Sequence, residues 1–202
     1  SAGESVTALN GKDYTLNDTM TVIADESGVH DIAGIMGGEH SGCSETTTDV
    51  LIEVAYFTPE CIALTGQALA LTSDARSRFE RGVDPAFLDD ATAIVTAHVL
   101  AICGGNPSAV TRAGTPPAEV KTVDYDPALS ATLGGIAIAP ERQQEILTAL
   151  GFTVIEQGSR WQVAVPSWRR DIDGAPDLVE EVTRITGFDA ICMQPNSGAQ
   201  GE

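Results

Sequence analysis

The segment Gly114-Thr-Pro116-Pro117 most constrains how this chain can fold, because a glycine and two prolines interrupt helices and strands alike. A chain of 202 residues can hold one large domain or two small ones. We therefore predict a boundary here, with a first domain over residues 1–116 and a second over residues 117–192. Residues 193–202 are rich in Gly, Asn, Gln and Ser, and we predict a disordered tail for them.

The first 116 residues carry signals of both strands and helices. Asn10-Gly11 is a strong turn dipeptide and predicts a hairpin over residues 6–16. Residues 50–57 form a nearly continuous apolar run, which predicts a strand covered on both faces. The remaining predicted elements are strands over residues 21–24 and 30–35, a helix opened by Thr58-Pro59, and a helix over residues 85–103. The expected class is α/β (α+β) with a mixed sheet, and we predict no apolar run long enough to span a bilayer.

Residues 117–192 follow the order of a winged-helix-like small domain. The predicted elements are a strand over residues 120–125, a short helix after Pro127, a helix over residues 140–150, and a hairpin of residues 152–156 and 161–165 around Gln157-Gly158. A further helix follows the hairpin. Such an order is also found in DNA-binding domains.

Charge argues against DNA as a partner. The helix over residues 140–150 carries Glu141 and Glu145 against the single Arg142, and the whole chain has a formal net charge of −18. Phosphate contacts need lysine and arginine, so this surface is unsuited to a duplex. We interpret the second domain as a spacer or docking module instead.

Four carboxylates near the end of the chain form the clearest candidate cluster. Asp177, Glu180 and Glu181 are spaced i, i+3 and i+4, which places them on one side of a helix's first turn, and Asp171 lies across a short turn from them. An all-oxygen cluster suits a hard cation, with Mg²⁺ first and Ca²⁺ or Mn²⁺ behind. The alternative is that these acids cap the helix and complement its dipole.

Glu53 is the second candidate, because it is a carboxylate within the apolar run of residues 50–57. A carboxylate among apolar neighbours needs a hydrogen-bond donor or a cation. One interpretation is a structural ion pair with a nearby arginine, and the other is a ligand-binding group in a pocket. The residues alone leave both open.

Three sequence blocks, in order, closely resemble the bacterial phenylalanyl-tRNA synthetase beta chain. They are Gly34-Ile-Met-Gly-Gly-Glu39 with Leu51-Ile-Glu-Val-Ala-Tyr-Phe57, then Ser73-Asp-Ala-Arg-Ser-Arg-Phe-Glu-Arg-Gly-Val-Asp-Pro85, then Pro166-Ser-Trp-Arg-Arg-Asp171 with Asp177-Leu-Val-Glu-Glu181 and Val182-Thr-Arg-Ile-Thr-Gly-Phe188. The resemblance runs from about residue 6 to residue 192. Because the family chain is much longer, it implies the later part of an editing domain followed by the small domain.

The resemblance implies an editing pocket for mischarged tyrosyl-tRNA(Phe). Glu53 matches the glutamate that recognises the tyrosine hydroxyl, and Gly37 matches a glycine whose missing side chain admits the substrate. Ser73 and Ala75 match further pocket positions, with serine at Ser73 where the family commonly has threonine. The family pocket also draws residues from a segment upstream of Ser1, so we expect the isolated chain to be a weak or inactive hydrolase.

The resemblance also implies cofactors and partners. Asp171, Asp177, Glu180 and Glu181 match magnesium carboxylates in a site shared with the alpha subunit, and ATP is a substrate of the whole enzyme. Expected partners are the alpha subunit, in a tetramer of two alpha and two beta chains, and tRNA(Phe), with no membrane. The resemblance further implies that the aminoacylation site lies in the alpha chain and that the protein is cytoplasmic. The alternative is a non-catalytic scaffold that only docks the alpha subunit and tRNA.

Overall fold

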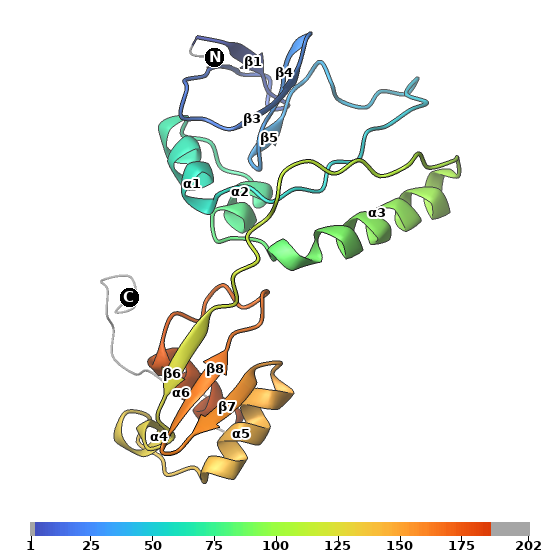
Figure 1. Ribbon diagram of the computed structural model, residues 1–202. Coiled ribbons are helices and arrows are strands. Elements are labelled where there is room, and N and C mark those ends of the chain that lie inside the picture. Colours follow the sequence, from blue (N-terminus) through green and yellow to red (C-terminus); the bar gives the residue numbers. More distant parts are fainter. Residues whose placement is uncertain (1–2, 187–202) are drawn as a thin grey trace. The chain divides into compact units, whose positions relative to one another are not determined.

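The computed structural model describes residues 3–186. The chain divides into two compact units, Ser1–Pro117 and Ala118–Glu202 (Figure 1). The tail predicted over residues 193–202, and the last matched residues Gly187 and Phe188, lie outside the described residues. Helices and small antiparallel sheets make up both units, which confirms the predicted α+β class.

The strands of the first unit form two small sheets. The hairpin predicted around Asn10-Gly11 is confirmed, with Val6 opposite Tyr14 and Gly11 at a φ of 74° in the turn. Its strands are β1 (Ser5–Thr7) and β2 (Asp13–Thr15). The second sheet contains β3 (Val22–Asp25), β4 (Gly28–Ile32) and β5 (Met36–Gly37) in the order β3-β4-β5, all antiparallel. A bridge between Ala8 and Gly38 joins the two sheets.

Helices complete the first unit. They are α1 (Pro59–Ala68), α2 (Asp74–Phe79), the 3₁₀ turn η1 (Pro85–Phe87) and α3 (Leu88–Cys103). The helix start predicted at Thr58-Pro59 is confirmed, with Pro59 at the first helical position, although the Thr58 side chain makes no capping hydrogen bond. The core of this unit consists of Val6, Leu16, Val29, Ile32, Ile35, Ile62 and Leu71.

The strand predicted over Val50–Phe57 is wrong. Residues 47–58 have no regular secondary structure, and the side chains of Val50 and Leu51 are 54% and 96% exposed. The later part of the run is half-buried, and Phe57 at its end lies against the core of the first unit. A strand requires a hydrogen-bonding partner as well as an apolar composition, and the described residues place no strand beside this run.

The prediction that no segment could span a bilayer was also too strict. The helical stretch Pro85–Cys103 is long and apolar enough to do so by length and composition. The helix α3 within it has no buried residue. Length and composition do not distinguish a membrane span from a helix of a water-soluble domain, and α3 carries the two acidic residues Asp89 and Asp90 in its first turn.

The second unit has one three-stranded sheet covered by helices. Its elements are β6 (Thr122–Tyr125), α4 (Leu129–Thr132), α5 (Pro140–Ala149), β7 (Thr153–Gln157), β8 (Arg160–Ala164) and α6 (Ala175–Ile185). The predicted order of helix, helix and hairpin is present, and β6 adds a third strand by pairing antiparallel with β8. Tyr125, Leu147, Trp161, Val163 and Leu178 are among the side chains of its core.

A buried polar side chain ties this core together. Gln143 on α5 is fully buried and accepts a hydrogen bond from the Tyr125 hydroxyl at 2.6 Å. Its Nε2 donates to the Pro127 carbonyl, the Ser130 hydroxyl and the Ile138 carbonyl. The amide thereby fixes the loop around α4 to the helix and the sheet, and it is the one hydrogen-bond partner of the Tyr125 hydroxyl among the described residues.

Candidate functional site

A cavity of about 490 Å³ lies in the first unit. Residues from β4 and β5, the extended segment before α1, and the helices α2 and α3 line it. Its walls are mostly apolar, with Phe57, Phe79 and Phe87 as the aromatic members. A cavity of this size, with apolar walls and a few polar groups, is typical of small-molecule sites.

Glu53 lines this cavity although the strand predicted to carry it is absent. Loss of solvent around the carboxylate raises the pKa of Glu53 above its ordinary value, and the negative charge of Asp31 adds to the effect. The Glu53 residue as a whole is nevertheless exposed, so the cavity is open to solvent beside it. Within the part of the chain that the structure describes, its side chain makes no hydrogen bond and no ion pair. The ion pair between Glu53 and an arginine, which the sequence left open, is therefore absent from the described residues.

Two glycines shape the wall of the cavity. Gly34 has a φ of 67°, and a Cβ there would lie 3.1 Å from both Phe57 and Phe79. At Gly37 a Cβ would lie 3.2 Å from the Asp31 carboxylate and 3.2 Å from Leu9. Both positions are therefore crowded by neighbouring side chains, and any side chain at Gly37 would require Asp31 or Leu9 to shift.

Ala75 and Ser73 differ in their placement. Ala75, in the first turn of α2, lines the cavity, whereas Ser73 is absent from its lining. The Ser73 hydroxyl caps α2 by accepting a hydrogen bond from the Arg76 amide at 3.0 Å, and it donates to the Ile35 carbonyl at 2.6 Å. Ser73 therefore anchors the start of α2 to the loop between β4 and β5, and this contact positions Ala75.

Asp31 is a lining residue that the sequence reasoning missed. It lies on β4 directly opposite Gly37, and its Oδ1 accepts a hydrogen bond from the Gly38 amide at 3.1 Å. The signal in the sequence was its position within a short apolar stretch, two residues before Ala33 and three before Gly34. Only the pairing of β4 with β5 shows that its carboxylate meets the glycine of the pocket.

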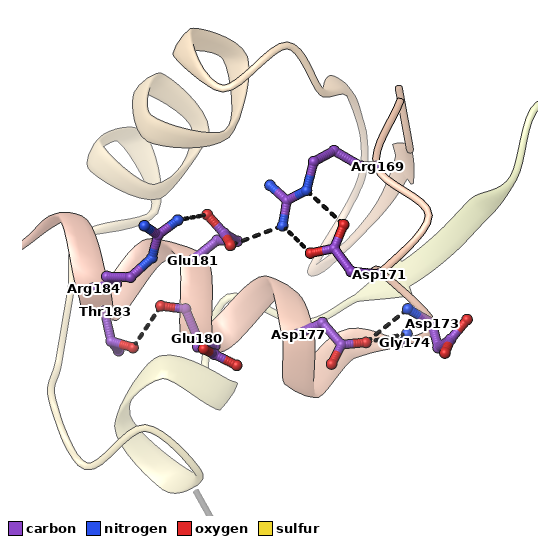
Figure 2. A network of polar contacts seen from close by, with 9 residues as sticks. All are labelled: Arg169, Asp171, Asp173, Gly174, Asp177, Glu180, Glu181, Thr183 and Arg184. Atoms are coloured by element: carbon purple, nitrogen blue, oxygen red, sulfur yellow. Dashed lines mark hydrogen bonds and ion pairs between the residues drawn. The ribbon is translucent and has the colours of Figure 1, made fainter. Parts of the chain in front are cut away.

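Contacts within this chain hold three of the four acids of the second unit, namely Asp171, Asp177 and Glu181 (Figure 2). Arg169 forms a two-pronged ion pair with Asp171, at 2.8 and 2.7 Å, and also contacts Glu181 at 2.8 Å. Glu181 is 6% exposed and pairs through its other oxygen with Arg184. Arg169 lowers the pKa of Asp171 through these hydrogen bonds. Arginines therefore neutralise Asp171 and Glu181 within this chain.

Asp177 and Glu180 have different surroundings. The Asp177 carboxylate accepts hydrogen bonds from the backbone amides of Asp173 and Gly174, at 2.7 and 2.9 Å (Figure 2). It therefore caps the start of α6, as the alternative interpretation predicted. The exposed Glu180 side chain makes no hydrogen bond or ion pair with other residues of the range 3–186.

These contacts do not fit a magnesium cage built by this chain alone. Among the described residues, no group of three or more His, Cys, Asp or Glu side chains is arranged to hold a metal ion. Arginines occupy the oxygens of Glu181, and backbone amides occupy one oxygen of Asp177. A hard cation needs several oxygens with free lone pairs pointing at one position.

Each of the two units matches a known domain family. Residues 1–104 match the family described as the B3/4 domain, and residues 123–188 match the tRNA synthetase B5 domain. The cavity lies within the first match, which also contains α3, and the carboxylates of α6 lie within the second. Because the B3/4 match covers more than half of the chain and a B5 domain follows it, the fold defines an aminoacyl-tRNA synthetase subunit.

Individual relatives specify the family further. The chain is 62% identical to the phenylalanine–tRNA ligase beta subunit of Novosphingobium aromaticivorans over 98% of its own length and 25% of the relative's. For the beta subunits of Paramagnetospirillum magneticum and Zymomonas mobilis, identity is 50% and 47%, over 96% and 93% of this chain and 24% and 23% of those proteins. The chain belongs to the phenylalanine–tRNA ligase beta-subunit family, which confirms the resemblance, and it spans about a quarter of these relatives' length.

Proposed function

We propose that this chain contributes part of an editing pocket to a phenylalanine–tRNA ligase, where mischarged tyrosyl-tRNA(Phe) is hydrolysed. The observation that carries the proposal is that Glu53, Gly37 and Ala75 line one cavity with aromatic walls. These residues come from three separate segments, so the fold brings them together. Ser73 contributes indirectly, because its hydroxyl holds the start of α2 and thereby positions Ala75.

The chemistry of such a pocket follows from the difference between the two amino acids. Tyrosine differs from phenylalanine by one hydroxyl, and an apolar synthesis site rejects an added hydroxyl only weakly. Glu53 has no hydrogen-bond donor among the described residues, so its carboxylate is available to accept a bond from the tyrosine hydroxyl. Phenylalanine would leave that acceptor desolvated and unpaired, at a cost of about 1–3 kcal/mol.

Hydrolysis itself is assigned to a positioned water molecule. The described lining residues contain no serine, cysteine or histidine that could act as a nucleophile or its base. Binding that places the ester beside a water molecule supplies the rate through orientation. In this proposal Gly37 gives the aminoacyl group room, and the aromatic side chains hold its ring.

The test is hydrolysis of tyrosyl-tRNA(Phe) by the full-length ligase that contains this chain, with and without Glu53→Ala. We expect tyrosine clearance to fall at least tenfold while aminoacylation with phenylalanine is unchanged. Glu60→Ala, which removes an exposed glutamate from the first turn of α1, is the matched control. Unchanged clearance by Glu53→Ala would favour the scaffold alternative, in which the chain only docks the alpha subunit and tRNA.

We further propose that Asp171, Asp177, Glu180 and Glu181 contribute to a magnesium site only in the assembled enzyme, together with the alpha subunit. Support comes from the free carboxylate of Glu180 and from the matched B5 domain. Bound Mg²⁺ would supply charge compensation for these acids. Calorimetry should show weak Mg²⁺ binding by the chain alone and tighter binding once the alpha subunit is added. Tight binding to the chain alone would contradict a shared site.

The remaining assignments follow from the family. We propose that the whole protein joins phenylalanine to tRNA(Phe) with ATP, works with the alpha subunit, and is cytoplasmic. We also propose that the first unit is the later part of the editing domain and that the second is its neighbouring small domain.

A further inference from the structure

The carboxylate of Asp31 lies beside the space that Gly37 leaves open. A Cβ at Gly37 would be 3.2 Å from Asp31 Oδ1, and the two residues are directly paired across β4 and β5. The Gly38 amide holds Oδ1 in place from behind at 3.1 Å. Asp31 and Gly37 are therefore neighbours, and both line the cavity.

The cavity has an unbalanced charge. Asp31, Glu53 and Asp84 line it, and no lysine, arginine or histidine is among the described lining residues. Asp84 is committed to the fold, because its carboxylate caps η1 by accepting a hydrogen bond from the Ala86 amide. Asp31 forms no ion pair within residues 3–186. A mostly apolar cavity with uncompensated carboxylates favours a ligand that combines an apolar body with a positive group.

An aminoacyl ester is such a ligand. Its α-amino group is free, with a pKa near that of a chain terminus, about 7.7–8.0, so much of it is protonated at neutral pH. The other end of a tyrosyl group is a phenol, which needs a hydrogen-bond acceptor. Two carboxylates that line one cavity can therefore bind the two polar ends of the same molecule, while the aromatic walls hold the ring between them.

We propose that Asp31 binds the α-ammonium group of the aminoacyl ester and thereby orients the side chain towards Glu53. This inference rests on the proposed editing function and adds a second recognised group to it. Asp31 would select a free α-amino group, whereas Glu53 would select the phenol. The influence of the Asp31 charge on the pKa of Glu53 agrees with two carboxylates that face one volume.

The discriminating experiment uses the full-length ligase and two substrates, tyrosyl-tRNA(Phe) and N-acetyl-tyrosyl-tRNA(Phe). Acetylation removes the positive charge and leaves the phenol and the ester intact. We expect Asp31→Asn to lower kcat/KM for the free ester on the order of tenfold to hundredfold, as for the loss of a charge-assisted hydrogen bond. The same variant should hydrolyse the acetylated ester as fast as the unaltered enzyme does, or faster.

Asparagine is chosen because its side-chain oxygen can still accept the bond from the Gly38 amide, so the loop keeps its support. Asp84→Asn is the matched control, since it removes an equal charge from the same cavity and asparagine still caps η1. Removing an acid near tRNA would strengthen the attraction to phosphate, so a loss of activity has the wrong sign for a general electrostatic effect.

The outcomes separate this inference from the function on which it rests. If Glu53→Ala abolishes tyrosine clearance but Asp31→Asn leaves the preference for the free ester unchanged, the editing function stands and the ammonium contact is refuted. Equal losses from Asp31→Asn and Asp84→Asn would also refute it, because charge alone would then explain the effect. If neither Glu53→Ala nor Asp31→Asn alters clearance, the proposed editing function itself fails.

Discussion

Glu181 offers a direct test of whether the acids of α6 are structural in this chain. Glu181 is 6% exposed and bridges two arginines, with Arg169 Nη2 at 2.8 Å and Arg184 on its other oxygen. Replacement by glutamine keeps the size of the side chain and one acceptor oxygen. It removes the charge and turns an NH₂ group towards a guanidinium that can only donate.

The loss of stability expected for Glu181→Gln depends on how exposed its two arginine partners are. Arg169 is 17% exposed, so its contact with Glu181 is a mostly buried charge-assisted hydrogen bond worth about 1.5–3 kcal/mol. Arg169 keeps its ion pair with Asp171 in this variant. We therefore expect the loss of stability to be smaller than the roughly 3–5 kcal/mol that is typical when a buried charge loses its last partner. Arg184 is 54% exposed and adds at most about 1 kcal/mol. We expect Glu181→Gln to destabilise the second unit by about 2–3 kcal/mol.

Urea denaturation followed by tryptophan fluorescence measures this unit selectively, because both tryptophans, Trp161 and Trp168, belong to it. EDTA in the buffer removes any contribution from metal ions. The control is Glu180→Gln on the same helix, whose side chain is exposed, and we expect a change within about 0.5 kcal/mol. A Glu181→Gln variant as stable as this control in EDTA would refute the ion-pair reasoning and leave mutual repulsion of unliganded acids as the better account.

Two further predictions concern the second unit. Gln143→Ala should destabilise it by about 3–5 kcal/mol in the same assay, because the change empties a buried position and leaves the Tyr125 hydroxyl unpaired in the core. Gln144→Ala, at the next position of α5, should destabilise the unit much less, and equal losses from the two variants would contradict the role of the Gln143 network. Asp171→Asn should lose about 1 kcal/mol or less at pH 7, since Asp171 is 64% exposed. The pKa of Asp171 is lowered in the fold, so its contribution is present above the ordinary value of 3.8 and disappears as pH falls through the folded value. The stability difference between Asp171→Asn and the unaltered chain should therefore shrink between pH 5 and strongly acidic pH, and a difference that grows on acidification would refute this assignment.

Local chemistry in the sequence was sufficient for most elements. Asn10-Gly11 can adopt the tight turn that closes a hairpin, and Pro59 has the backbone angle of a first helical turn wherever it occurs. These preferences depend on a residue and its immediate neighbours. The three family blocks are long runs in a fixed order, so the sequence alone was sufficient to single out Glu53, Gly37 and Ala75, which line one cavity.

Tertiary structure alone decided the features that depend on a partner distant in the sequence. The apolar run of residues 50–57 has the composition of a strand, but no neighbouring strand pairs with it in the described residues. The Ser73 hydroxyl donates a hydrogen bond to the Ile35 carbonyl, 38 residues away in the sequence. Asp31 lies opposite Gly37 only because of the register in which β4 pairs with β5. The acids of α6 share a helical face by spacing alone, yet Arg169, from outside that helix, decides that Glu181 is ion-paired. Sequence spacing fixes which side chains share a face, whereas contacts between segments depend on how the chain packs.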